Sequence, residues 1–414
     1  MAKWPKLTWD TEPTGPLKGI KVIDMSTVVL GPYATLQFAD LGAEVIKIEN
    51  SEGNTPGDLM RHGGDSPTKQ HGPIFTALNR NKKAINLNIK KPKDKAVLEA
   101  LLEDADVFIH NVRMAGVERL GFGYEGVKAI NPDIIYVHCA GFGAGGAYGE
   151  RQAYDDIIQA ASGFAALSEQ RDGKRPNYAP SLVADKVSGL FAANATMAAL
   201  LARAGGQGGQ FVQVPMFECF TWFNMVENLW GETFVPGNGR MGYTRSVNPR
   251  RRPYPTKDSF IAIVPYNDRQ WAKFFELGGR PNVFDDPRFA TYQDRTKHTG
   301  ELYALIEEVS GLYTTAEWLE LLAQHDIPAM KYNRLADVLA DPHLADVGFF
   351  EELESPDIGK YRSMKHPVHY AGTPITNYAH PPMLDADGDK IKAALGMEFP
   401  PSLGEDKPKP TTRA

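Results

Sequence analysis

Cysteine is scarce in this chain: its 414 residues include only two, Cys139 and Cys219, within the apolar segments YVHCAG and MFECF. Neither belongs to a CxxC pair, and the ten histidines form no HExxH or carboxylate-paired spacing. A disulfide framework is therefore excluded. We predict two buried free thiols in a reducing compartment and no metal site.

Long apolar runs and an excess of positive charge are also missing. The first residues, MAKWPKLTWDTEPTGPLKG, lack the apolar run of a signal peptide, and no stretch of about 18 apolar residues stands out. The net charge is -6, and Arg250–Arg252 is the main basic run. Because such a chain does not attract phosphate backbones or anionic lipid, we predict a cytoplasmic protein with no nucleic-acid or membrane partner. The three arginines would suit a dicarboxylate if they face a cleft; solvated surface charge is the alternative interpretation.

The chain has the composition of an ordinary globular protein, and its expected strands and helices alternate regularly. Hydrophobic residues make up 42% and charged residues 23%, and the length is sufficient for a large and a small domain. Buried strands alternate with helices of about a dozen residues, which is typical of a parallel sheet in an α/β fold. The expected strands cover 19–25, 44–50, 84–89, 106–111, 133–141 and 211–216, and the expected helices 31–43, 93–105, 124–130 and 186–204.

The residue composition changes near Phe217. An aromatic-rich helix, a Gly/Pro/Arg loop and a strand at 260–266 are expected from there on. We predict a large domain over 1–216, a small domain over 217–336, and a return segment over 337–414 that completes the large domain. The Pro/Lys-rich tail from Pro400 is expected to be mobile.

Two acidic segments carry candidate chemistry. In APSLVADKVSG, Asp185 stands just before the expected helix, so it is either a helix N-cap or a carboxylate kept ionised by the helix terminus for attack on an acyl carbon. In AYDDIIQAASG, Tyr154, Asp155 and Asp156 fit a polar helix start, with Tyr154 a candidate hydrogen-bond donor. Residue spacing alone does not decide between these interpretations.

Basic residues flank two of the expected strands. Arg80, Lys82 and Lys83 precede one, and Asn111, Arg113 and Arg119 follow another. Such positions suit a phosphate-bearing ligand, although solvated surface charge is the commoner explanation.

A literal GxGxxG occurs at Gly141–Gly146, directly after a strand. A dinucleotide fingerprint also needs a helix that opens at the third glycine, whereas Tyr148 and Glu150 follow here. Glu49 ends the second strand, where a ribose-binding carboxylate could sit, but the preceding turn contains only Gly31. A flexible loop is favoured over nicotinamide binding.

Taken together, these segments resemble the class III CoA-transferase family, which includes formyl-CoA transferase, carnitine CoA-transferase and the α-methylacyl-CoA racemases. The likeness covers nearly the whole chain and is carried by GPLKGIKVIDMSTVVLGPYA, LGAEVIKIE, NRNKKAINLNIKKPKD, NVRMAGVERLGFGYE, AYDDIIQAASG, LVADKVSGL, GQFVQVPMFE and DIPAMKYNRLADVLADPHLADVGFF. So many ordered matches make a chance resemblance improbable.

The resemblance implies a Rossmann-like large domain with a parallel sheet, a smaller α+β domain, and an interlocked homodimer. It implies that Asp185 is the catalytic aspartate and that Tyr154 is an active-site tyrosine. By position, the implied coenzyme A contacts are Val28, Lys82, Asn111 and Arg119. Coenzyme A and acyl-CoA would be substrates together with a small carboxylic acid, and no permanently bound cofactor is expected.

Departures from the formyl-CoA transferase pattern limit what carries over. Asn50 and Gln152 replace an arginine and a lysine, and the glycine run of its mobile loop is reduced to Gly237, Gly239 and Gly242. Backbone N–H groups of this loop and of the helix start at Asp185 are candidate oxyanion donors. The alternatives are a racemase of the same superfamily, a nicotinamide-dependent oxidoreductase that uses Gly141–Gly146, and a non-catalytic CoA-binding protein.

Overall fold

The computed structural model describes residues 8–9, 14–50, 52 and 55–397. The chain forms two compact units: unit 1 comprises 1–158, 182–220 and 347–414, and unit 2 comprises 159–181 and 221–346. The tail from Pro400, expected to be mobile, lies outside the described residues.

A six-stranded sheet forms the centre of unit 1, in the order β4-β3-β2-β5-β6-β7. Every neighbouring pair is parallel, which confirms the parallel α/β sheet predicted from the alternating pattern. The strands are β2 (Lys21–Met25), β3 (Glu44–Glu49), β4 (Lys82–Asn86), β5 (Val107–His110), β6 (Ile135–Ala140) and β7 (Gln210–Pro215). The order reverses between β2 and β5, which is the doubly wound arrangement that places ligands at the carboxyl ends of the strands.

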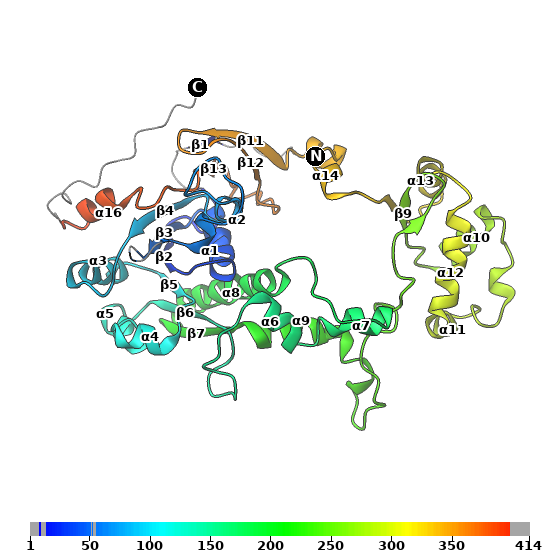
Figure 1. Ribbon diagram of the computed structural model, residues 1–414, viewed down its shortest axis with the longest axis horizontal. Helices are drawn as coiled ribbons and strands as arrows, with labels where there is room; N and C mark the ends of the chain where they lie inside the picture. Colours follow the sequence, from blue (N-terminus) through cyan, green and yellow to red (C-terminus); the bar gives the residue numbers. More distant parts are fainter. Residues whose placement is uncertain (1–7, 10–13, 51, 53–54, 398–414) are drawn as a thin grey trace. The chain divides into compact units, whose positions relative to one another are not determined.

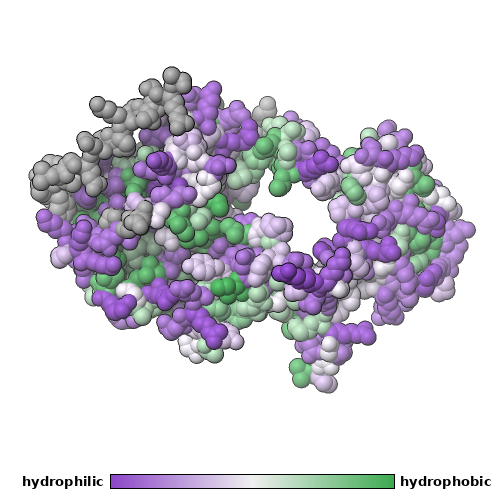
Figure 2. Space-filling view, viewed as in Figure 1, coloured by the Kyte–Doolittle hydropathy of each residue, from purple (hydrophilic) through white to green (hydrophobic). Residues whose placement is uncertain are grey.

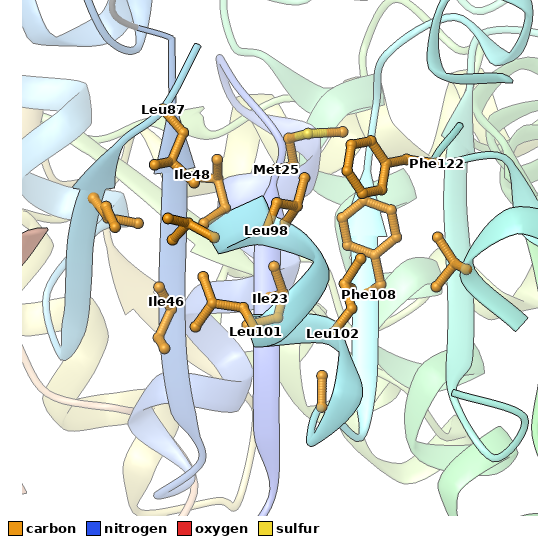
Figure 3. Packing of buried hydrophobic residues seen from close by; sticks show 14 of the residues in the cluster. Ile23, Met25, Ile46, Ile48, Leu87, Leu98, Leu101, Leu102, Phe108 and Phe122 are labelled. Carbon is orange, nitrogen blue, oxygen red and sulfur yellow. The ribbon is translucent and has the colours of Figure 1, made fainter. Parts of the chain in front are cut away.

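Helices cover both faces of this sheet (Figure 1). On one face, α3 (Pro92–Glu103), α4 (Met114–Arg119) and α5 (Tyr124–Ile130) pack on alternate strand residues. Figure 3 shows Leu98, Leu101 and Leu102 of α3 against Ile23 and Phe108. The intervening residues face α1 (Leu30–Asp40) and α8 (Val183–Ala202), which pack against each other.

α8 is the longest helix of the described residues and is rich in alanine and leucine. Together with the turn that follows, over Val183–Gln207, it is long and apolar enough to cross a membrane by length and composition, a test that core helices also pass. This qualifies the expectation that no such stretch occurs. α8 packs on α1, β6 and β7, which accounts for part of its apolar surface.

The remaining elements of unit 1 are short and include returning segments. They are β1 (Thr8–Trp9), which pairs with β13 (Asn377–Tyr378), the hairpin β11 (Phe350–Ser355) and β12 (Gly359–Met364), and η1 (Leu59–Arg61), α2 (Pro73–Leu78), η2 (Arg203–Gln207) and α16 (Gly388–Ala394). α6 (Asp155–Ala161) and α9 (Met216–Asn228) each run from unit 1 into unit 2.

Unit 2 has its own small sheet and core. β9 (Phe260–Ile263) pairs antiparallel with β8 (Tyr254–Pro255) and β10 (Ala329–Lys331). The helices are α7 (Ala166–Asp172), η3 (Trp230–Glu232), α10 (Asp268–Leu277), η4 (Val283–Asp285), α11 (Tyr292–Lys297), α12 (Thr299–Ser310), α13 (Thr315–Ala323), α14 (Leu335–Val338) and α15 (Pro342–Asp346). Trp318 is fully buried among Phe274 and Ile306, and its indole N–H donates to Ser310 O over 2.7 Å. Much of the visible outer face of these helices is hydrophilic (Figure 2).

The unit boundaries differ from the sequence-based ones. Residues 159–181, which we expected in the large domain, belong to unit 2, and the return to unit 1 begins at Val347 rather than at Asp337. The reason is that the chain passes into unit 2 twice, and the first passage is a helical segment without a change of composition that marks a boundary.

Candidate active site

A pocket of about 310 Å³ lies at the carboxyl ends of the central strands of unit 1. It is lined by the β2–α1 loop, the β5–α4 loop, the end of β6 with the loop that follows, and single residues of α8 and β7. The lining residues are Thr27–Leu30, Asn111, Arg113, Met114, His138–Phe142, Ala144, Gly149–Tyr154, Asp185, Gln213 and Met216. Because β2 and β5 flank the reversal of strand order, this is the expected ligand crevice of the fold.

Asp185 lies in the first turn of α8 rather than in front of it. The helix begins at Val183 with Leu182 in the N-cap position, so the interpretation of Asp185 as an N-cap is wrong. The sequence placed the helix start three residues too late because Asp185 is a typical N-cap residue, whereas Leu182, the actual N-cap, is not. The Asp185 side chain is half-buried and reaches the pocket.

Asp155 caps α8 instead, although it belongs to a different helix. Its Oδ1 accepts the backbone N–H groups of Ala184 over 2.8 Å and Asp185 over 3.0 Å. Two of the free N–H groups of the first turn are thereby satisfied. They are not available to an oxyanion, which corrects the expectation that the helix start at Asp185 supplies such donors.

The position of Asp155 also changes the protonation of Asp185. Burial, with the nearby Asp155 carboxylate as the second cause, raises the pKa of Asp185 to about 7. This overturns the expectation that the helix terminus keeps the carboxyl group fully ionised, because desolvation and a like charge both disfavour the anion. At neutral pH the unliganded protein holds Asp185 partly protonated.

Gly189 brings α8 close to the β2–α1 loop. A Cβ atom at this position would lie 2.8 Å from Leu30 O and 3.1 Å from Tyr33 Cδ1. A hydrogen at this position therefore lets α8 pack beside Leu30, which itself lines the pocket. This gives a physical reason for the glycine one turn after Asp185.

The loop after β2 is held in an unusual conformation. Val28 has φ of 72°, which is uncommon for a β-branched residue. Its N–H donates to Asp58 Oδ1 over 3.1 Å, and Asn111 both accepts from Thr27 N over 3.1 Å and donates to Thr27 O over 2.8 Å. Val28 and Asn111, both predicted ligand contacts, thus lie together at the pocket, and Asn111 also positions the loop.

Lys82 lies elsewhere. β4 begins at Lys82, two residues before the expected strand, and the side chain is fully buried. Its ammonium donates to Asp24 Oδ2, Pro32 O, Thr35 Oγ1 and Asn79 Oδ1 over 2.8–3.2 Å. Since Lys82 does not line the pocket, the structure gives it a role in the core beneath the ligand loop.

Arg119 is also outside the pocket lining. It ends α4 and is exposed, whereas Arg113, just before the same helix, lines the pocket. Arg151 lines it as well and lies 4.5 Å from the ring centroid of Tyr148. Sequence reasoning named Arg113 only among several basic residues and missed Arg151, because a loop arginine has no periodic signal.

Tyr154 reaches the pocket directly in front of α6. Its side chain is 61% exposed, so its hydroxyl is accessible to a ligand. The structure therefore brings Asp185, Tyr154, Val28 and Asn111 to one pocket, and leaves Lys82 and Arg119 outside its lining.

Other polar groups at the pocket are poor nucleophiles. Burial holds the pKa of the Cys139 thiol above its ordinary value, so it stays protonated. Burial also lowers the pKa of His138, whose Nε2 lies 3.2 Å from Val112 O and must donate to that carbonyl. Glu150 is exposed in the loop. Asp185 is thus the half-buried carboxylate of the pocket.

The Gly141–Gly146 loop lacks the geometry of a dinucleotide fingerprint. No helix opens at its third glycine, and the next helix, α6, begins at Asp155. The N–H of Gly143 donates to Glu218 Oε1 over 2.9 Å, so it does not point at a ligand phosphate. Glu49, the candidate ribose ligand, is buried in an ion pair with Arg61.

The remaining groups that the sequence indicated as candidates belong to unit 2. The loop with Gly237, Gly239 and Gly242 and the run Arg250–Arg252 are parts of unit 2. Across the residues that the structure describes, no group of three or more His, Cys, Asp or Glu side chains could hold a metal ion.

Comparison with known proteins agrees with this architecture. The family model described as CoA-transferase family III matches residues 17–388. The chain is 32% identical over 400 residues to an acyl-CoA transferase of Fusarium pseudograminearum, covering 93% of this chain and 86% of that one. It is 30% identical over 391 residues to a succinate–glutarate CoA-transferase of Agrobacterium fabrum, covering 92% and 96% of the two chains.

A solved structure shares the fold. The crystal structure of a CAIB/BAIF family protein from Brucella suis superposes with a TM-score of 0.75 at 30% identity and covers 92% of this chain and 100% of that one. The family-model match over residues 17–388 includes every segment that lines the pocket. The chain therefore belongs to CoA-transferase family III.

Proposed function

We propose that this CoA-transferase moves coenzyme A from an acyl-CoA donor to a carboxylic acid acceptor by covalent catalysis at Asp185. The observation that carries the proposal is the position of Asp185: a half-buried carboxylate at a pocket on the carboxyl ends of the central strands. A carboxylate shielded in part from water can attack an acyl carbon, and anhydride intermediates survive longer where water is excluded.

In the first half of the reaction, Asp185 Oδ attacks the thioester carbonyl carbon of the donor. The C–S bond breaks, coenzyme A leaves as a thiolate, and an aspartyl mixed anhydride forms. The thiolate then attacks the Asp185 carbonyl carbon of the anhydride. This releases the donor acid as a carboxylate and leaves Asp185 as an aspartyl-CoA thioester.

The second half repeats these steps with the acceptor. The acceptor carboxylate attacks the Asp185 carbonyl carbon, the thiolate leaves again, and a second mixed anhydride forms. Attack of the thiolate on the acceptor carbonyl carbon gives the new acyl-CoA and regenerates the Asp185 carboxylate. No net proton transfer is needed, so the pocket has to stabilise charge rather than move protons. Tyr154, exposed at the pocket, is the proposed hydrogen-bond donor to the oxyanions.

Succinyl-CoA with glutarate is the first substrate pair to test, because relatives at 30–31% identity are named for succinate or succinyl-CoA and glutarate. A screen of succinyl-CoA and acetyl-CoA against a panel of carboxylic acids, read by mass spectrometry, would identify donor and acceptor. Absence of turnover with every pair would favour the non-catalytic CoA-binding alternative.

The racemase alternative is tested separately. A racemase needs two opposed acid/base groups, and a phenol hydroxyl is a poor second group beside Asp185. Incubation of 2-methylacyl-CoA with the protein in D₂O should leave the α-carbon unlabelled. Deuterium at that carbon would contradict the transferase proposal.

Trapping tests the covalent mechanism directly. Incubation with acyl-CoA followed by hydroxylamine should convert the Asp185 side chain into a hydroxamate, detected by peptide mass spectrometry. The same treatment without acyl-CoA is the control. Modification of Asp155, Asp156 or Glu150 instead would show that another carboxylate is the nucleophile.

The proposed coenzyme A contacts are Val28, Asn111 and Arg119 from the resemblance, with Arg113 and Arg151 added from the pocket lining. Lys82, which the resemblance also implied, is buried against Asp24. Charge-assisted contacts are worth about 1.5–3 kcal/mol, so Arg113→Ala or Arg119→Ala should weaken CoA binding about tenfold if the residue contacts phosphate. Lys82→Ala should instead lower stability, since it leaves the buried Asp24 carboxylate without its ion-pair partner. Calorimetry and thermal denaturation of the three variants separate these roles.

A further inference from the structure

A second pocket, of about 290 Å³, lies wholly within unit 2. Its floor is apolar and is made by residues of the β8–β9 strands and α12, including the buried side chains of Tyr254, Ile263, Leu302 and Ile306. The proposed transfer of coenzyme A does not use this pocket.

Four arginines line the pocket, and they fall into two pairs. Arg252 is neutralised by Glu307 over 2.8 Å, and Arg295 is paired with Asp268. Arg245 and Arg251 have no carboxylate partner within unit 2, every residue of which the structure describes. Two positive charges of the pocket wall are therefore not compensated by a carboxylate of unit 2.

Arg245 is the more informative of these two. It is half-buried, its Nε donates to Tyr303 Oη over 2.9 Å, and Tyr243 also hydrogen-bonds it. Both partners are neutral hydroxyl groups that fix the guanidinium without cancelling its charge. A half-buried cation held in this way differs from a solvated surface arginine such as Arg250, which pairs with Glu307 over 3.1 Å.

Aromatic side chains form the rim. Tyr266 and Tyr292 are 79% and 74% exposed, and Trp271 lines the same pocket. Exposed aromatic rings at the mouth of an apolar cavity are typical of sites that bury a ligand of mixed character, with a few polar groups that set its orientation.

We propose that this pocket of unit 2 binds an organic carboxylate with an apolar chain, whose carboxylate pairs with Arg245 and Arg251 and whose chain lies against Tyr254, Ile263 and Trp271. Guanidinium groups suit this ligand because they bind carboxylates with two parallel hydrogen bonds. The site is separate in its residues from the pocket at Asp185, so the inference stands whether or not Asp185 is the nucleophile.

The test measures binding rather than turnover. Hexanoate and its neutral isostere hexanamide are titrated into the full-length protein, with calorimetry and Trp271 fluorescence as readouts, and Trp271→Phe identifies the fluorescence that reports on this pocket. Hexanoate should bind saturably and at least about tenfold more tightly than hexanamide, because the amide lacks the charge. Glutarate, titrated in parallel, distinguishes a dicarboxylate ligand from a monocarboxylate.

Arg245→Gln should weaken hexanoate binding about tenfold or more. Arg280→Gln is the matched control, because Arg280 pairs with Glu308 and does not line the pocket, so its affinity should equal that of the wild type. If Arg245→Gln does not fold, as judged by circular dichroism, the exposed Arg251→Gln serves in its place. Equal affinity in a folded Arg245→Gln or Arg251→Gln variant, or no saturable binding up to about 50 mM hexanoate, would overturn the proposal.

Discussion

At the scale of single residues, the carboxyl group of Asp185 combines two properties that oppose each other. Its proposed chemistry needs the anion, yet burial and the Asp155 carboxylate favour the neutral acid and raise its pKa to about 7. A nucleophile placed in this way is reactive when ionised because it is poorly solvated. The same placement makes it a source of instability in the free protein above neutral pH.

Asp185→Asn should lower turnover about a thousandfold or more, since the variant keeps the side-chain volume and loses the attacking oxygen anion. The fold should survive because the cap of α8 comes from Asp155. Steady-state kinetics and thermal denaturation measure both effects. The exposed Asp156→Asn is the control and should be close to wild type; near wild-type turnover in Asp185→Asn would mean that the nucleophile is a different residue.

The same substitution should change the pH dependence of stability. A folded pKa raised from 3.8 to about 7 contributes stability that is fully present below pH 4 and is lost as pH rises towards 7. Asp185→Asn removes this loss, so its melting temperature relative to wild type should be higher at pH 8 than at pH 4. A difference that does not vary with pH would contradict the raised pKa.

The pH profile of catalysis follows from the same group. Below pH 7, kcat/KM for acyl-CoA should fall about tenfold per pH unit, because only the ionised fraction of Asp185 attacks the thioester. Asp155→Asn keeps an oxygen for the cap of α8 and removes the like charge, so the midpoint should move to lower pH. Burial, the larger cause, should keep it above the ordinary value. An unchanged midpoint in Asp155→Asn would exclude the charge of Asp155 as a cause.

At the scale of elements, the close packing of α8 on the β2–α1 loop connects the nucleophile to the ligand loop. Gly189→Ala would place a methyl group 2.8 Å from Leu30 O, and overpacking of this kind costs about 1–3 kcal/mol. Chemical denaturation should show that loss of stability, and CoA affinity should fall because Leu30 and its neighbours line the pocket.

Gly205→Ala is the matched control for this prediction. Gly205 lies in η2 at the far end of the same helical segment, and a Cβ atom there meets nothing within 4 Å. The control should therefore be neutral or slightly stabilising. Equal stability of the two variants would show that α8 and the loop can move apart without cost.

At the scale of the whole molecule, large apolar side chains remain exposed on and after α9. Trp222 is 66%, Val226 69%, Phe234 76% and Val235 98% exposed. Exposed apolar surface of this kind is typical of a protein–protein interface. We therefore expect the homodimer that the family resemblance implies.

Light scattering coupled to size-exclusion chromatography should give about twice the chain mass of 45.6 kDa. Trp222→Glu together with Val226→Lys places charges on this surface and should shift the protein towards the monomer or reduce its solubility. Lys186 lies on a different helix, α8, so Lys186→Glu is a charge-change control that should leave the mass unaltered. A monomeric wild type at micromolar concentration would contradict the expected dimer.

The amino-acid sequence alone determined the parallel α/β sheet and most of its elements. The segments 107–109 and 134–137 are continuous apolar runs that alternate with helices, and this pattern is typical of strands covered by helices on both sides. The ordered motifs also identified the family and the segment that contains Asp185. These are local properties, because each can be recognised from a short segment of the chain alone.

Only the tertiary structure decided how distant residues act on one another. Asp155 caps α8 across a separation in sequence of 30 residues. Burial, followed by the charge of Asp155, raises the pKa of Asp185. Lys82, which the resemblance implied as a ligand contact, is a buried partner of Asp24, 58 residues away in the sequence. Burial and Coulomb interactions depend on distances in space, and the spacing of residues along a chain does not contain those distances.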